Sequence, residues 1–77
     1  MSVVHLTQLK AKQTATVKEI LGGDDVNNRL NSLGVRPGKR VTLISAHFWR
    51  GPVTVLLDKM KIAIGYGMAQ KIMVEVE

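Results

Sequence analysis

The feature that most constrains this chain is a series of short apolar runs, each of which ends at a turn signal. The last run, residues 71–77, alternates most clearly: Ile72, Val74 and Val76 share one side, and Lys71, Glu75 and Glu77 share the other. Such alternation is typical of a β-strand with one buried face. No run approaches the ~18 apolar residues of a membrane-spanning helix. The chain is therefore expected to be mainly β.

The same kind of pattern predicts four further strands, at Thr14–Leu21, Val41–Ser45, Val53–Asp58 and Met60–Ile64. In the last two of these strands, the residues expected to share a face are Val53, Val55 and Leu57, and Met60, Ile62 and Ile64. Residues 65–70 predict a tight helical turn. Residues 1–13 are expected to form a lead-in segment that packs loosely over one end of the fold.

A short helix is predicted directly after the break at Gly22 and Gly23. Asp24 and Asp25 would supply its N-cap and first-turn carboxylates, because the unpaired N–H groups and the helix dipole favour negative charge there. The positions that form its apolar stripe are Val26, Leu30 and Leu33. Gly34 is the expected left-handed residue after the helix, and Pro37 with Gly38 predicts a turn.

Five short strands with one helix inserted after the first predict a small, strongly bent β-barrel. Curling the sheet shut would remove the open edges that invite aggregation. A length of 77 residues supports one hydrophobic core, so residues 1–77 are expected to form a single domain. Pro52 fits the start of a strand, since proline donates no ladder hydrogen bond.

The composition excludes several classes of protein. The absence of cysteine excludes a disulfide framework, a zinc finger and a thiolate nucleophile. The N-terminal residues lack the layout of a signal peptide, so a cytoplasmic location is the default expectation. The net charge of +5 fits a surface drawn to anions, but the basic residues are scattered. A charge of this size is commonly a matter of solubility.

No catalytic or metal-binding pattern is complete. His5 and His47 fall in the lead-in segment and in a loop, and no serine near them has a nucleophile-elbow context. Asp24 and Asp25 are already explained by the helix start, which leaves too few ligands for a transition-metal site. The three internal methionines are typical of irregular core filling: Met60, Met68 and Met73. We predict no enzymatic activity, no cofactor and no resident metal.

At residues 30–44 the pieces combine into a more specific pattern. A helix that ends in R-L-x-x-L-G, followed by an apolar residue, one spacer, P-G and a strand, resembles the FeoA family. The matching positions are Arg29, Leu30, Leu33, Gly34, Val35, Pro37 and Gly38. The second half is also similar, at Gly51, Pro52 and Val53, at Ile62–Gly65 and at Ala69–Ile72. The resemblance covers about residues 6–77 and is carried mostly by architectural positions, among them Gly65.

The resemblance implies an SH3-like barrel that acts as an accessory protein of bacterial ferrous-iron uptake. Its implied partner is the cytoplasmic, G-protein-like domain of a membrane ferrous-iron transporter. Contact with the membrane would then be indirect, through that partner at the inner membrane. The oligomeric state stays open, as does the direction of any effect on transport.

The segment His47–Arg50 departs from the family pattern, which commonly has a loop rich in Pro, Leu and Gly here. It holds two of the three aromatic residues, Phe48 and Trp49, beside a turn. Because consecutive strand-like residues point to opposite faces, we expect Phe48 to point inward. Trp49 and Arg50 are residue types enriched in binding hot spots. We therefore predict a partner-binding surface at His47, Phe48, Trp49 and Arg50, together with the helix positions Asn27, Asn28 and Asn31.

Two other functions were weighed. Small β-barrels bind nucleic-acid strands through stacked aromatics and a basic track, but this chain has one adjacent aromatic pair and scattered lysines. No nucleic-acid partner is therefore expected. An iron-responsive regulatory domain is the other alternative, because relatives of the family are fused to iron-dependent repressors, and His5 with His47 would be the residues to test for metal sensing.

Overall fold

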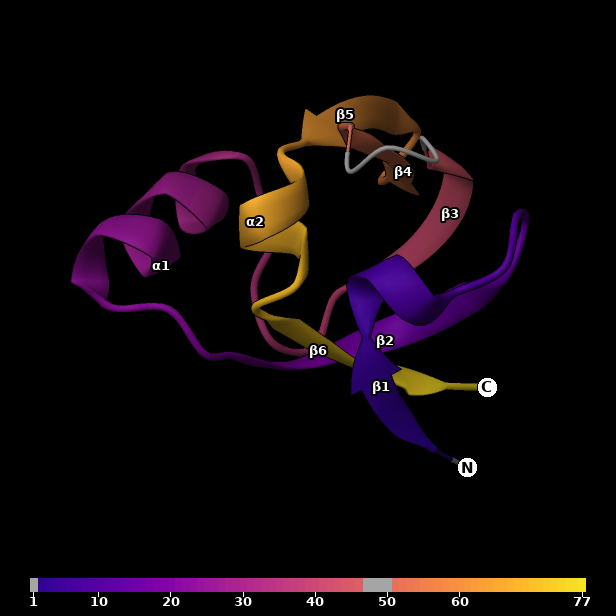
Figure 1. The fold of residues 1–77 in the computed structure, drawn as a ribbon, viewed down its shortest axis with the longest axis horizontal. Coiled ribbons are helices and arrows are strands. Elements are labelled where there is room, and N and C mark those ends of the chain that lie inside the picture. The colour runs from indigo at the N-terminus through magenta and orange to yellow at the C-terminus, as the bar shows by residue number, and fades with distance from the viewer. Residues whose placement is uncertain (1, 47–50) are drawn as a thin grey trace.

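A computed structural model describes residues 2–46 and 51–77 of the chain (Figure 1). Within these residues the strands are β1 (Val3–His5), β2 (Thr14–Ile20), β3 (Arg40–Ala46), β4 (Val53–Leu57), β5 (Met60–Ile64) and β6 (Ile72–Val76). The helical elements are a 3-10 turn, η1 (Leu6–Gln8), and two α-helices, α1 (Asp24–Ser32) and α2 (Tyr66–Ala69). The mainly β class, the inserted helix and the helical turn near residues 65–70 are confirmed.

The strands form one antiparallel sheet in the order β1-β6-β2-β3-β4-β5. Figure 1 shows β1, β2 and β6 at one end of the molecule and β4 with β5 at the other, joined by β3. The register shifts between Val17 and Glu19 on β2 and between Leu43 and Ser45 on β3. Such irregularities bend strands and increase their twist, which explains how one sheet wraps around one core.

Two expectations about the sheet are wrong. The described residues contain six strands rather than five, because Val3–His5 pairs with β6 and is not a loose lead-in. Leu6 and Leu9, which follow β1, are buried in the core. The sheet is also not closed by hydrogen bonds within the described residues, since β1 and β5 remain its two edges. The burial of Leu6 and Leu9 supplies the physical reason for the ordered N-terminal segment.

The core is apolar throughout the part of the chain that the structure describes, with no buried polar or charged residue. The alternating faces predicted from sequence supply much of it: Val53, Val55 and Leu57 are buried, as are Ile62, Ile64, Ile72 and Val74. Val76 is only partly buried against the core. Met60 contradicts the prediction, since it is 60 % exposed. It is the first residue of β5, an edge strand that is paired on one side only, whereas its cross-strand partner Leu57 is buried.

Helix α1 follows the predicted position, with two corrections. Its N-cap is Gly23, so Asp24 and Asp25 both lie in the first turn rather than one of them capping the helix. Leu30 is fully buried, but Leu33 is 39 % exposed. Leu33 is the C-cap residue, where the chain leaves the helix and turns toward Gly34. The buried stripe is therefore shorter than the sequence spacing predicted.

Backbone geometry explains the turn residues. Gly34 and Gly38 adopt φ values of +91° and +96°, which confirms the left-handed residue after α1 and the turn at Pro37-Gly38. The β4–β5 hairpin turns at Asp58 and Lys59, whose φ values of +49° and +69° are typical of a two-residue type I′ turn. Gly65 is the N-cap of α2, and Pro52 directly precedes β4.

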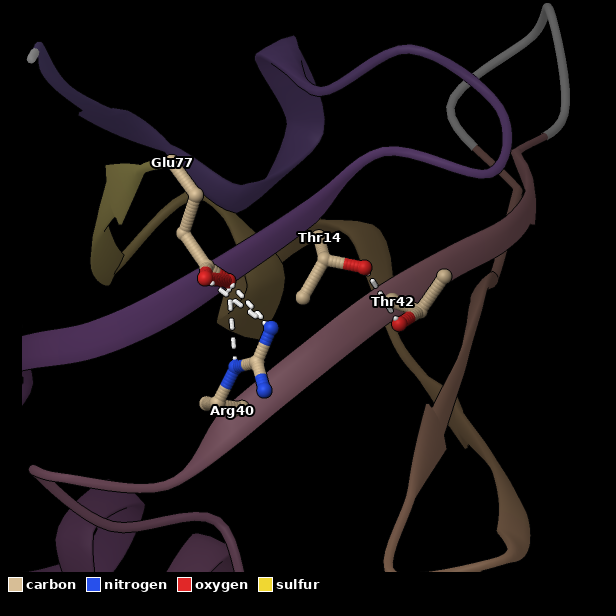
Figure 2. Close-up of polar contacts among 4 residues, drawn as sticks. All are labelled: Thr14, Arg40, Thr42 and Glu77. Atoms are coloured by element: carbon tan, nitrogen blue, oxygen red, sulfur yellow. Dashed lines mark hydrogen bonds and ion pairs between the residues drawn. The ribbon is translucent and has the colours of Figure 1, made fainter.

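Polar contacts join strands across the sheet (Figure 2). The hydroxyl oxygens of Thr14 on β2 and Thr42 on β3 lie 2.8 Å apart. The Arg40 guanidinium on β3 donates to both carboxylate oxygens of Glu77, with a shortest distance of 2.7 Å. Glu77 directly follows β6, and β2 lies between β6 and β3 in the sheet. This ion pair therefore reaches across β2. Lys39 and Asp58 join two turns in the same way, at 2.6 Å.

Candidate protein-binding groove

An open groove of about 680 Å³ lies between α1, β5 and α2. Its lining combines apolar and polar side chains. The lining residues are Asp25, Asn28, Arg29, Ser32, Leu33, Ala63 and Met68. Five of the seven come from α1 and its C-cap, one from β5 and one from α2. The groove is therefore formed jointly by α1 and by the consecutive elements β5 and α2, which follow α1 by some thirty residues.

The local structure of α1 fixes the helical wall of the groove. Leu30 anchors the helix in the core, which turns Asn28, Arg29 and Ser32 toward the outside. The Ser32 hydroxyl donates a hydrogen bond of 2.9 Å to the Asn28 carbonyl oxygen, so this side chain is held against its own helix. The exposed part of Leu33 then offers apolar surface at the end of the wall.

The predicted partner-binding residues do not all reach this groove. Asn28 lines it. Asn27 instead donates its side-chain amide to the carbonyl oxygens of Gly22 and Gly23, at 2.8 and 3.0 Å, and so fastens the start of α1. Asn31 is exposed, and its carbonyl oxygen accepts a hydrogen bond from the Gly34 N–H. The positions His47, Phe48, Trp49 and Arg50 lie outside the described residues.

Sequence reasoning missed Arg29, Leu33, Ala63 and Met68 as surface-forming residues. The sequence pattern places Leu33 in the apolar stripe and Met68 in the core, and it includes Arg29 only through the family resemblance. Ala63 alternates with Ile62 and Ile64, so its outward position was readable from the strand pattern. The position of Ala63 next to α1 could not be predicted, because no spacing in the sequence relates β5 to α1.

His5 has a structural contact in place of a metal-binding context. Its Nδ1 lies 2.6 Å from the Gln70 carbonyl oxygen, so this nitrogen carries the proton and donates to the residue after α2. Across residues 2–46 and 51–77, no group of three or more histidine, cysteine or carboxylate side chains is arranged to hold a metal ion. No helix in these ranges is long and apolar enough to cross a membrane.

The family model of the FeoA domain matches residues 4–76. The chain belongs to the FeoA family. A protein of Methanocaldococcus jannaschii whose name includes the words Fe(2+) transport protein A is 38 % identical over 66 residues, which cover 86 % of this chain and 78 % of that protein. The family model begins within β1, at Val4, so it includes most of the N-terminal strand.

Solved structures show the same fold at full length. The crystal structure of an iron uptake regulatory protein, FeoA, matches with a TM-score of 0.90 and 28 % identity, covering all of both chains. The SH3-like fold expected from sequence is thus confirmed. The regulator IdeR of T. acidophilum matches with a TM-score of 0.87 and 32 % identity, covering all of this chain but 35 % of that one. A FeoA-type domain therefore also occurs as part of a larger regulator.

Proposed function

We propose that this protein is a non-enzymatic accessory protein of ferrous-iron transport that acts by binding another protein. The observation that carries the proposal is the family match over residues 4–76, joined by the relative named for Fe(2+) transport. The absence of a complete catalytic pattern in the sequence supports a binding role over a catalytic one. The proposed location is the cytoplasm.

The proposed partner is the cytoplasmic, G-protein-like domain of a membrane ferrous-iron transporter. The groove between α1, β5 and α2 supports a protein-binding role, because its lining combines the exposed Leu33 and the half-buried Met68 with charged and amide groups. A protein interface has this composition, with an apolar centre and a polar edge. Membrane association would arise only through the partner.

Titration of the isotope-labelled protein with the isolated transporter domain tests the proposal. We expect amide shifts at groove positions such as Asn28 and Ala63, in the presence or absence of guanine nucleotide. The matched reference is the far end of the sheet, at Val3 and Val4, which should stay unshifted. No shift at any ratio, with and without nucleotide, would rule out direct binding to this domain.

The segment His47–Arg50 remains a predicted part of the binding surface. Trp49 is the only tryptophan, so its fluorescence reports on this segment without labelling. We expect the transporter domain to change that fluorescence, and Trp49→Ala to weaken binding while the thermal unfolding midpoint stays the same. An equal loss of binding and stability would assign Trp49 to the core instead.

The likeness to IdeR favours a second candidate, a domain that serves an iron-responsive regulator. In that role the groove would bind the surface of a regulatory protein. Anaerobic titration with ferrous iron separates the two candidates when the His5→Gln variant is compared with the unmodified protein. Saturable binding that requires His5 would favour the regulator, and its absence would favour the transport role.

A further inference from the structure

The β5 strand presents an open edge beside the groove. It pairs only with β4 among the described strands, and the pairs run from Leu57 opposite Met60 to Val53 opposite Ile64. In a hairpin with a two-residue turn, the pair that flanks the turn is hydrogen-bonded and the next pair is not. The N–H and C=O groups of Lys61 and Ala63 therefore point away from β4.

The same two residues connect the edge to the groove. Ala63 lines the groove together with Leu33 and Met68, so a backbone edge and an apolar hollow meet at one residue. Both Lys61 and Ala63 are exposed. An extended peptide that pairs with this edge can place alternate side chains toward the hollow, as in recognition by strand addition.

The charges beside the edge select the kind of peptide. Arg29 lines the groove and Lys61 lies on the edge, and neither takes part in an ion pair between described residues. One carboxylate, Asp25, also lines the groove. The protein as a whole carries a net charge of +5. A lysine on an edge strand disfavours pairing between two copies of the same chain, so the charges favour a different, acidic partner.

We propose that the β5 edge binds an extended segment of the partner protein that carries apolar and acidic residues in turn along one strand face. The segment adds a strand beside Lys61 and Ala63, and the face that it shares with these two side chains places apolar residues against Leu33 and Met68 and carboxylates opposite Arg29 and Lys61. The identity of the partner rests on the proposed function, but the peptide chemistry follows from the edge and the charges alone.

The first test uses backbone-selective variants. Ala63→Pro removes an N–H that has no partner in β4 and is compatible with an edge strand, whereas Ala63→Ser keeps the N–H and nearly the same volume. We expect roughly tenfold weaker binding of the transporter domain for Ala63→Pro, given the worth of a backbone hydrogen bond and the loss of close approach. Ala63→Ser should bind normally. Binding by Ala63→Pro at full strength, with its fold intact by circular dichroism, would overturn the proposal.

The second test separates groove side chains from general apolar surface. Leu33 and Met60 are both large, exposed apolar residues, but only Leu33 lines the groove. Leu33→Ala should weaken binding through lost contact in the groove, and Met60→Ala should not. Equal effects of the two variants would contradict binding of the partner segment in the groove.

A third test does not depend on the transporter. The soluble peptide acetyl-Thr-Val-Thr-Glu-Thr-Val-Thr-Glu-amide, which carries Val and Glu in turn on one face, should shift the amide signals of Lys61 and Ala63 and slow their hydrogen exchange. The lysine counterpart of the peptide should do neither. If the transporter domain fails to bind but the acidic peptide binds, the proposed function is wrong and the edge proposal stands. If neither peptide binds, or if Ala63→Pro abolishes a concentration-dependent dimer of this chain, the edge proposal is overturned.

Discussion

A β-carbon placed on Gly22 would lie 2.5 Å from the β-carbon of Val26. Val26 lies in the first turns of α1 and packs against the core, so the chain entering the helix passes directly over it. The backbone of Gly22 is not in the left-handed region. Glycine is therefore required here because a side chain would not fit, and not because of the backbone conformation. The close approach of Gly22 to Val26 fixes the position of α1 relative to the sheet. It thereby also fixes one wall of the groove.

We expect Gly22→Ala to destabilise the fold by about 1–3 kcal/mol, because the added methyl group must displace either Val26 or the chain entering α1. Chemical unfolding gives the free energy directly. Gly67→Ala is the matched control, because a β-carbon there meets nothing within 4 Å. Equal stability of Gly22→Ala and Gly67→Ala would show that the entry to α1 is free to shift.

Leu30 and Leu33 come from the same sequence motif but differ in burial. Leu30→Ala should cost about 2–5 kcal/mol, because it removes a fully buried side chain and leaves a cavity under α1. Leu33→Ala should change stability by about 0.5 kcal/mol or less, as expected for a surface position. Thermal and urea unfolding of both variants check the contrast. A large loss for Leu33→Ala would assign it to the core.

The hydroxyl pair of Thr14 and Thr42 joins β2 to β3 at a half-buried position. Each single change to valine should cost about 0.5–1.5 kcal/mol, since it leaves the other hydroxyl without its partner. The double variant should recover part of that loss, because β-branched apolar pairs also stabilise facing strands. A double-mutant cycle measures the coupling. Strict additivity of the two single effects would show that the hydrogen bond contributes nothing.

The ion pair of Arg40 and Glu77 has two-pronged geometry but exposed ends, with side-chain exposures of 66 % and 45 %. Exposed pairs contribute about 0.2–1 kcal/mol. We therefore expect Glu77→Gln to cost less than about 1 kcal/mol at low salt, and the difference to shrink in molar salt as the charges are screened. Arg40→Lys should lose part of the same effect through its single donor group. A difference that persists at high salt would point to packing rather than charge.

Local patterns in the sequence were sufficient for the elements that depend on near neighbours. The alternation at Ile72 and Val74 predicted a buried strand face, and the glycine after Leu33 predicted the left-handed turn at Gly34. These features depend on side-chain direction along a strand and on the steric cost of a β-carbon, both of which act over a few residues. The Asp58-Lys59 turn fell at the predicted junction, although neither residue is a glycine.

Predictions went wrong where the outcome depended on distant partners. The N-terminal residues Val3–His5 became a strand because β6 offers them an open edge, and Leu6 and Leu9 bury themselves next to it. Their own spacing contains little strand signal. Met60 fits the alternation of β5 but is exposed, because β5 is an edge of the sheet and only its β4 side is covered at this position.

Residue order and short-range sterics were enough to predict the mainly β class, the position of α1, the turns and the family. The order of the six described strands, the open edges of the sheet and the groove formed by Arg29, Ala63 and Met68 depend on the tertiary structure. Those residues come from three separate elements, and only the folding of one bent sheet around a shared apolar core makes them neighbours.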